Sequence, residues 1–235
     1  MKETFLEQTY KKLIVSCQAL EDEPLFSPDI MSSMAVAAMR GGAAAIRANS
    51  IEDISAIRKS VKLPMIGIIK KNYPGSNVVI TPTEAEVDAL VEIGVEVIAL
   101  DATNRKRPNG ETVHNWFLGI RNKYPDKVFM ADCSTYQECV QAQELGFDIV
   151  GTTLCGYTQE THGVALPNMQ LLRDLGSTLC IPIIAEGGIW TPEQLVEILN
   201  IPSIHSAVVG TAITRPMEIT RRFTQLLASE LSIRH

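Results

Sequence analysis

The sequence lacks the features that mark disulfide-rich, zinc-binding or membrane proteins. It has five cysteines, an odd number, and no two of them are spaced as CxxC. This pattern argues against a disulfide or zinc framework and favours reduced thiols in a cytoplasmic protein. No apolar run reaches the length of a membrane span, and the acidic start of the chain does not resemble a signal peptide, so we expect neither.

An excess of positive charge is also missing. The chain has 21 Lys and Arg residues against 27 Asp and Glu residues, which gives a net charge of -6 and a pI near 5.3. A nucleic-acid or acidic-membrane binder needs a basic face, so we expect neither partner. The one basic cluster, residues 103–108, is interpreted as a solvated loop.

No Pro/Gly/Ser-rich linker divides the 235 residues, and strand-like and helix-like patterns alternate about eight times along them. Such alternation predicts parallel strands joined by right-handed crossovers. The expected strands are 13–19, 43–49, 64–71, 95–101, 127–132, 147–153, 181–186 and 203–210.

Two parallel architectures compete, an open doubly wound sheet and a closed (β/α)₈ barrel. The length, the number of units and the absence of G-x-G-x-x-G after the first strand favour the barrel. We therefore expect a single (β/α)₈ TIM barrel of the phosphate-binding type over residues 1–235, with a short helix near residues 6–12.

Closure of a barrel would gather the polar residues that end the strands on one face. Lys70 and Glu186 are the candidates for proton transfer among them. Gly187–Gly188 and Gly210–Thr211 follow the last two strands, where many barrels bind phosphate, although glycines there could serve only to make tight turns. The full set of polar strand ends is Gln18, Arg47, Lys70, Asp101, Asp132, Thr153, Glu186 and Gly210–Thr211.

Histidines do not point to a metal centre, because none of the four follows a predicted strand beside carboxylate partners. His205 falls inside an apolar strand and is interpreted as a core residue with satisfied hydrogen bonds. We expect no metal ligands.

Six short strings along the chain resemble the N-acetylmannosamine-6-phosphate 2-epimerase family of sialic acid breakdown. They are LIVSCQA at 13–19, GIIK at 67–70, IALDAT at 98–103, GTTL at 151–154, IAEG at 184–187 and VVGTAITRP at 208–216. The resemblance implies a cofactor-free (β/α)₈ barrel that inverts C2 of N-acetylmannosamine 6-phosphate to give N-acetylglucosamine 6-phosphate.

By this resemblance Lys70 and Glu186 are the catalytic residues, and Arg47 and Asp132 lie around the sugar with Gln18 and Thr153. The phosphate would contact Gly187, Gly188, Gly210, Thr211 and Arg215, whose guanidinium suits phosphate oxygens. Two residues depart from the expected pattern: Thr211 stands where a second glycine is expected, and Asn72 stands where many relatives have an acid.

The chemistry of the candidate residues agrees with that implication. A C2 proton beside the C1 aldehyde of an opened sugar is acidic, and a buried lysine beside Arg47 would be neutral and able to take it. Either a second group or the same lysine then returns a proton.

Two other functions remain open from the sequence. A different phosphate-binding barrel could use Lys70 to polarise a carbonyl or to form a Schiff base, and an idle barrel could sense a sugar phosphate. We also expect a homodimer, although the apolar C-terminal helix could dock on its own barrel instead.

Overall fold

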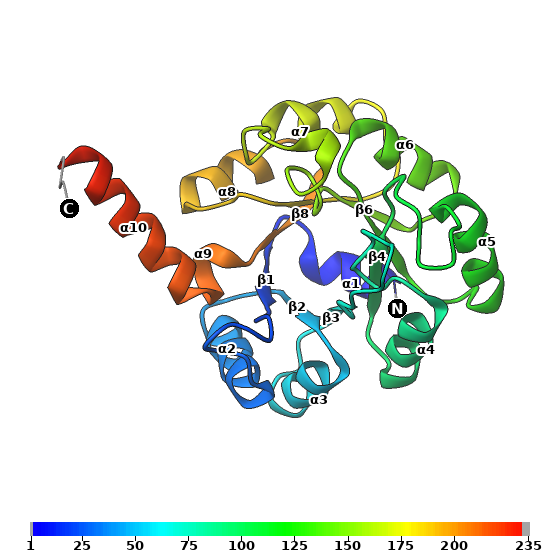
Figure 1. The fold of residues 1–235 in the computed structure, drawn as a ribbon, viewed down its shortest axis with the longest axis horizontal. Helices are drawn as coiled ribbons and strands as arrows, with labels where there is room; N and C mark the ends of the chain where they lie inside the picture. Colours follow the sequence, from blue (N-terminus) through cyan, green and yellow to red (C-terminus); the bar gives the residue numbers. More distant parts are fainter. Residues whose placement is uncertain (1, 232–235) are drawn as a thin grey trace.

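The computed structural model describes residues 2–231, and it contains a closed barrel of eight parallel strands in the order β1 to β8 (Figure 1). This confirms the predicted (β/α)₈ architecture and excludes the open sheet. Each strand pairs with its neighbour in the chain, and β1 also pairs with β8 through Ile14 and Val208. The strands are β1 Leu13–Cys17, β2 Ala45–Asn49, β3 Met65–Ile68, β4 Val97–Asp101, β5 Phe129–Asp132, β6 Ile149–Gly151, β7 Ile183–Glu186 and β8 Ile204–Val209.

Helices form an outer ring around the strands (Figure 1). Most begin where a Ser, Thr or Asn precedes the helical pattern; Thr135 and Thr191, for example, cap their helices through side-chain bonds. The helices are α1 Lys2–Thr9, α2 Pro28–Arg40, α3 Ile51–Ser60, α4 Glu84–Ile93, α5 Val113–Lys123, α6 Tyr136–Glu144, α7 Met169–Gly176, α8 Pro192–Leu199, α9 Thr211–Thr214 and α10 Pro216–Glu230, with a 3₁₀ turn at Gln159–Thr161.

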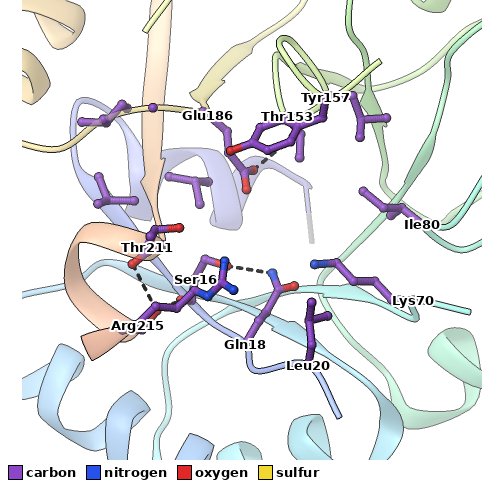
Figure 2. A pocket seen from close by; sticks show the side chains of 18 of the residues that line it. Ser16, Gln18, Leu20, Lys70, Ile80, Thr153, Tyr157, Glu186, Thr211 and Arg215 are labelled. Carbon is purple, nitrogen blue, oxygen red and sulfur yellow. Dashed lines mark hydrogen bonds between the residues drawn. The ribbon is translucent and has the colours of Figure 1, made fainter. Parts of the chain in front are cut away.

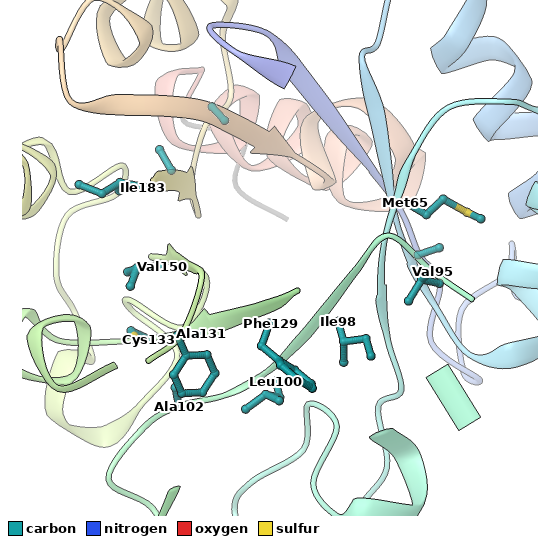
Figure 3. Packing of buried hydrophobic residues seen from close by; sticks show 14 of the residues in the cluster. Met65, Val95, Ile98, Leu100, Ala102, Phe129, Ala131, Cys133, Val150 and Ile183 are labelled. Carbon is teal, nitrogen blue, oxygen red and sulfur yellow. The ribbon is translucent and has the colours of Figure 1, made fainter. Parts of the chain in front are cut away.

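The apolar residues form two clusters, because successive side chains of a strand point to opposite faces. One cluster fills the space between the barrel and its helices, and includes Ile98, Leu100 and Phe129 (Figure 3). The other fills the barrel interior, where Phe5 of α1 joins Ile14 and Ile66. The first helix thus inserts a phenylalanine into the apolar interior of the barrel, and this interior supports the residues at its other end.

His205 lies against α1 and forms the hydrogen bonds that were expected of it, but it is half-buried and does not belong to the core. Its Nε2 atom lies 3.2 Å from Thr9 Oγ1 and 3.1 Å from the carbonyl oxygen of Leu6. Burial lowers the pKa of this imidazole below its ordinary value.

Residues 103–108 form a loop, as expected, but only part of it is solvated: Asn104 and Lys106 are exposed, whereas Arg107 is not. Arg107 is buried, with its guanidinium 3.6 Å from the centre of the Trp116 ring. It donates hydrogen bonds to the carbonyl groups of Thr81, Pro82 and Asp101. Burial lowers the pKa of Arg107 to about 10. The Arg107 guanidinium thus joins the segments that follow β3 and β4. Charge patterning along the sequence could not show this burial.

The C-terminal helix α10 projects from the barrel, and none of its described residues is buried (Figure 1). Docking of this helix on its own barrel, one of the two possibilities that the sequence allowed, is therefore not observed. Between residues 2 and 231, no helix combines the length and apolarity needed to cross a membrane. Met1 and residues 232–235, which the predicted domain includes, lie outside the described residues.

Candidate active site

A cavity of about 420 Å³ opens at the carboxyl ends of the strands, where the sequence placed the site. Its size is within the range of small-molecule sites. Nine of the eleven predicted site residues line it: Gln18, Lys70, Thr153, Glu186, Gly187, Gly188, Gly210, Thr211 and Arg215. Figure 2 shows side chains from distant parts of the chain converging on this space.

Lys70 enters the cavity from a point two residues beyond β3 (Figure 2). Its backbone forms an isolated antiparallel bridge with Ile80, on the segment that returns from the β3–α4 loop. Burial and the nearby positive charge of Arg47 lower the pKa of its amine, and Glu186 opposes the shift only in part. The environment therefore favours the neutral, basic form of this lysine.

Glu186 ends β7 on another side of the cavity (Figure 2). The Thr152 hydroxyl donates to its carbonyl oxygen at 2.9 Å and accepts from its N–H at 3.0 Å, which fixes the backbone. The carboxyl group contacts Thr153 Oγ1 at 3.1 Å. Burial raises its pKa, and Arg47 counteracts this only partly. The environment thus favours the protonated acid.

Arg47 and Asp132 form a buried ion pair behind Glu186 and are not among the residues that line the cavity. The guanidinium donates to both carboxylate oxygens, at 3.1 and 2.6 Å, and the two side chains are 1% and 0% exposed. Arg47 Nη1 also lies 3.3 Å from Glu186 Oε2. Burial alone would lower the pKa of Arg47, but Asp132 and Glu186 outweigh it and raise the pKa.

Gln18 lies between Lys70 and Ser16 in the view of Figure 2. Its Nε2 donates to Ser16 Oγ at 2.7 Å. Its Oε1 is buried and accepts no hydrogen bond from the described residues. A buried acceptor without a partner is costly, so this oxygen is suited to a donor group on a ligand.

The glycines at the ends of β7 and β8 form one wall of the cavity. Gly188 has a φ of 69°, and a Cβ atom there would lie 2.2 Å from Leu166 Cβ, so close packing alone requires glycine. Packing against Leu166 is thus a sufficient reason for glycine at position 188. Gly210 approaches Ser16, where an added Cβ would lie 3.2 Å from Ser16 Cβ.

Arg215 lines the same end of the cavity and forms an ion pair with Glu23 of the β1–α2 loop. Its buried Nε has no partner among the described residues. Burial would raise the pKa of Glu23, but the Leu20 N–H and Arg215 outweigh this and lower it. The pair places one cation at the rim, beside the glycine backbone.

Asp101, another polar strand end, does not join the cavity lining. It accepts from the Thr103 N–H and hydroxyl and forms an ion pair with Arg105 at 2.5 Å. Burial raises its pKa despite these partners. The aspartate therefore organises the β4–α5 loop.

Thirteen of the residues that line the cavity were not predicted, and Ser16, Glu23 and Tyr157 are among the polar ones. Ser16 could have been found, because it precedes Gln18 by two residues and strand alternation places both on one face. Glu23 and Tyr157 lie in loops whose paths have no periodic signal in the sequence. No group of three or more His, Cys, Asp or Glu side chains within residues 2–231 is arranged to hold a metal ion, and His235 lies outside that range.

Comparisons with known proteins find relatives along nearly the whole chain. Residues 31–229 match the family model described as putative N-acetylmannosamine-6-phosphate epimerase. A protein of Enterobacter sp. (strain 638) named putative N-acetylmannosamine-6-phosphate 2-epimerase is 55% identical over 222 residues, 94% of each chain. A protein of the same name from Clostridium perfringens (strain SM101 / Type A) is 54% identical over 215 residues, 92% of this chain and 96% of its own.

A solved structure of the N-acetylmannosamine-6-phosphate 2-epimerase from Clostridium perfringens has a TM-score of 0.89 and 52% identity, covering 94% of this chain and 96% of that one. A Schiff base forming fructose-1,6-bisphosphate aldolase, at 15% identity and a TM-score of 0.65, shares the fold alone. The sequence similarity spans nearly the whole chain and includes the strands that carry Lys70 and Glu186. The chain belongs to the N-acetylmannosamine-6-phosphate 2-epimerase family.

Proposed function

We propose that this protein interconverts N-acetylmannosamine 6-phosphate and N-acetylglucosamine 6-phosphate in sialic acid and amino sugar catabolism. The observation that carries the proposal is the pair of Lys70 and Glu186, which face one cavity in a chain of this family. Their environments shift the two pKa values in opposite directions, down for the amine and up for the carboxyl group. A neutral base and a neutral acid at one carbon are what a proton exchange needs.

The reaction begins at C2 of the open-chain sugar, whose proton is acidified by the C1 aldehyde. Neutral Lys70 takes this proton, and the resulting enolate is stabilised by the donors of the cavity. Glu186 is the acid that returns a proton to C2 from the opposite face. Positioned proton transfer of this kind is typically worth about 10² to 10⁴-fold in rate. No electrons are gained or lost in the exchange, so the proposal includes no cofactor.

The phosphate group lies, in this proposal, against Gly187, Gly188, Gly210 and Thr211, with Arg215 donating to its oxygens. Arg215 is supported as a ligand by its place at the cavity rim and by its unpartnered Nε. Thr211 keeps a backbone N–H where glycine is expected in the family. Binding at the phosphate supplies energy far from C2 that can orient the reacting carbon.

Gln18, Arg47, Asp132 and Thr153 complete the substrate site in this proposal. The free Oε1 of Gln18 and the hydroxyl of Thr153 line the cavity and can bond polar groups of the sugar. Arg47 and Asp132 act from behind Glu186, through the ion pair that adjoins its carboxyl group.

We also propose that the protein works as a homodimer in the cytoplasm. Helix α10 and its C-cap residue Leu231 expose four large apolar residues, Phe223, Leu226, Leu227 and Leu231, which a second copy would cover. Arg222 of the same helix stacks 4.4 Å from the ring centre of Trp190, a cavity residue, so the helix is connected to the site. Four buried free thiols, Cys17, Cys133, Cys139 and Cys155, fit a reducing compartment.

The test of the catalytic roles is turnover in D₂O with matched variants. We expect the wild-type protein to place deuterium at C2 of both sugars, Lys70→Ala to abolish turnover and Glu186→Gln to slow it severely. Lys71→Ala is the control, because that neighbouring amine is 56% exposed and lies outside the cavity lining; its activity should match the wild type.

Two results would contradict this route. An epimerised product that keeps its original C2 hydrogen would exclude proton exchange with the solvent. Trapping of a substrate adduct on Lys70 by borohydride would instead indicate a Schiff base, which the proposed chemistry does not form.

A further inference from the structure

Asn49, the last residue of β2, contacts the backbone of Lys70 with its side chain. The Lys70 N–H donates to Asn49 Oδ1 at 2.7 Å. The residue is 9% exposed, so little of it is in contact with water. The amide of one strand end thus holds the peptide that carries the proposed base.

This contact extends the hydrogen-bond ladder between β2 and β3 by one bond beyond its last backbone bond. Asn49 pairs with Ile68 in register, and the Ser50 N–H donates to the Ile68 carbonyl at 3.0 Å. In a regular parallel ladder the next bond would run from the Lys70 N–H to the Ser50 carbonyl. Ser50 instead turns with a φ of 69°, and its carbonyl accepts from the Ile54 N–H as α3 begins. Asn49 Oδ1 supplies the missing acceptor.

The other side of Lys70 is held mainly by backbone, with one longer side-chain bond from the Ile69 N–H to Thr81 Oγ1 at 3.4 Å. The Lys71 N–H donates to the Val79 carbonyl at 3.0 Å, and the Thr81 N–H donates to the Ile69 carbonyl at 2.8 Å. The peptide of Lys70 therefore lies between two segments of the chain, the end of β2 and residues 79–81, and is hydrogen-bonded on both sides. The bond to Asn49 is the one that a side chain makes to the Lys70 N–H itself, and it can be removed by substitution.

We propose that Asn49 is a positioning residue for Lys70, which sets the direction from which the amine enters the cavity. The inference rests on the proposed epimerase function. An amide suits this role because it provides an acceptor without a charge. An aspartate would provide the same acceptor, but its negative charge would favour the protonated form of the amine.

The test compares Asn49→Ala, which removes the acceptor, with Asn49→Asp, which keeps it. We expect Asn49→Ala to lower kcat by about 10 to 100-fold, because small misplacements of a reacting group cost this much, and to leave KM within about threefold. For Asn49→Asp we expect kcat to recover at high pH to within about threefold of the wild type, with the acid limb of the pH profile moved upward.

Thr135→Ala is the matched control, since Thr135 Oγ1 also accepts a backbone N–H, that of Glu138, but caps a helix outside the cavity lining. We expect a lower Tm and an unchanged kcat. A second readout is the titration of the Lys70 side chain by NMR with ¹³C-labelled lysine, assigned with Lys70→Arg. It should move to higher pH in both Asn49 variants.

Two results would overturn the inference: a kcat within twofold of the wild type in Asn49→Ala, or an unmoved Lys70 titration in Asn49→Asp. The second also decides the matter if Asn49→Ala does not fold. Absence of turnover by the wild-type protein would contradict the proposed function only, because the lysine titration reports on the Asn49 contact without substrate.

Discussion

Replacing Arg47 by methionine should reveal how strongly the buried ion pair holds the site together. The substitution keeps much of the side-chain length and removes the charge that lies 2.6 Å from Asp132 and 3.3 Å from Glu186. Asp132 would then be an unpaired carboxylate in a side chain with 0% exposure. Removal of one partner of a buried pair typically costs about 3 to 5 kcal/mol.

That cost can be measured as a loss in the free energy of unfolding by urea. For a chain of this length it corresponds to a fall in Tm of about 6 to 20 °C. The double variant Arg47→Met with Asp132→Leu replaces both charges by apolar groups, which is often near neutral. We expect it to recover at least about 2 kcal/mol of the loss, since no unpaired carboxylate is left at position 132 and the Thr153 hydroxyl can turn to Glu186.

A second readout separates electrostatics from packing. Arg47 is one of the causes that lower the pKa of Lys70, so its removal should move the titration of Lys70 to higher pH. The single variant Asp132→Leu completes the comparison. If the losses in unfolding free energy of Arg47→Met and Asp132→Leu simply add in the double variant, and the Lys70 titration does not move, the pair is not a coupled unit.

His205 should make the protein acid-sensitive. Burial lowers its pKa, so below about pH 6.5 the unfolded chain binds a proton that the folded chain does not. The free energy of unfolding should therefore fall with decreasing pH, by up to about 1.4 kcal/mol per pH unit. Urea unfolding between pH 7 and 5 should show a weaker pH dependence in His205→Asn, and an equal slope in both proteins would contradict this prediction. Phe223→Asp should convert the proposed dimer to a monomer in sedimentation equilibrium, because it puts a charge on the apolar face of α10; a wild-type protein that is already monomeric would refute the dimer.

Much of the fold follows from local signals. Apolar runs that end at polar residues, each followed by a capped helical pattern, predict a parallel barrel, and the order of the strands agrees with that prediction. The site follows from the same topology, because a closed sheet brings strand ends such as Lys70 and Glu186 to one cavity. Their roles remain predictions.

The parts that could not be predicted depend on where loops run. Arg107 is charged and lies in a polar stretch, yet it is buried over Trp116 because α5 returns beneath the loop. Glu23 reaches Arg215 across 192 positions of sequence. Asn49 ends a strand like its neighbours, but only the turn at Ser50 leaves its amide facing the Lys70 N–H. These contacts are set by backbone geometry that periodicity does not encode.

The protonation states of the site are best understood by counting charges inside the barrel. Arg47 and Asp132 cancel each other as a buried pair. A neutral Lys70 beside a protonated Glu186 adds no charge, whereas ionising either one alone leaves an uncompensated charge away from water. The Thr153 hydroxyl has one proton to donate and lies 2.6 Å from Asp132 Oδ1, closer than the 3.1 Å to Glu186 Oε2. The hydroxyl can therefore donate fully to only one of these two carboxyl groups. Burial therefore shifts both groups towards the uncharged forms that the proposed proton exchange requires.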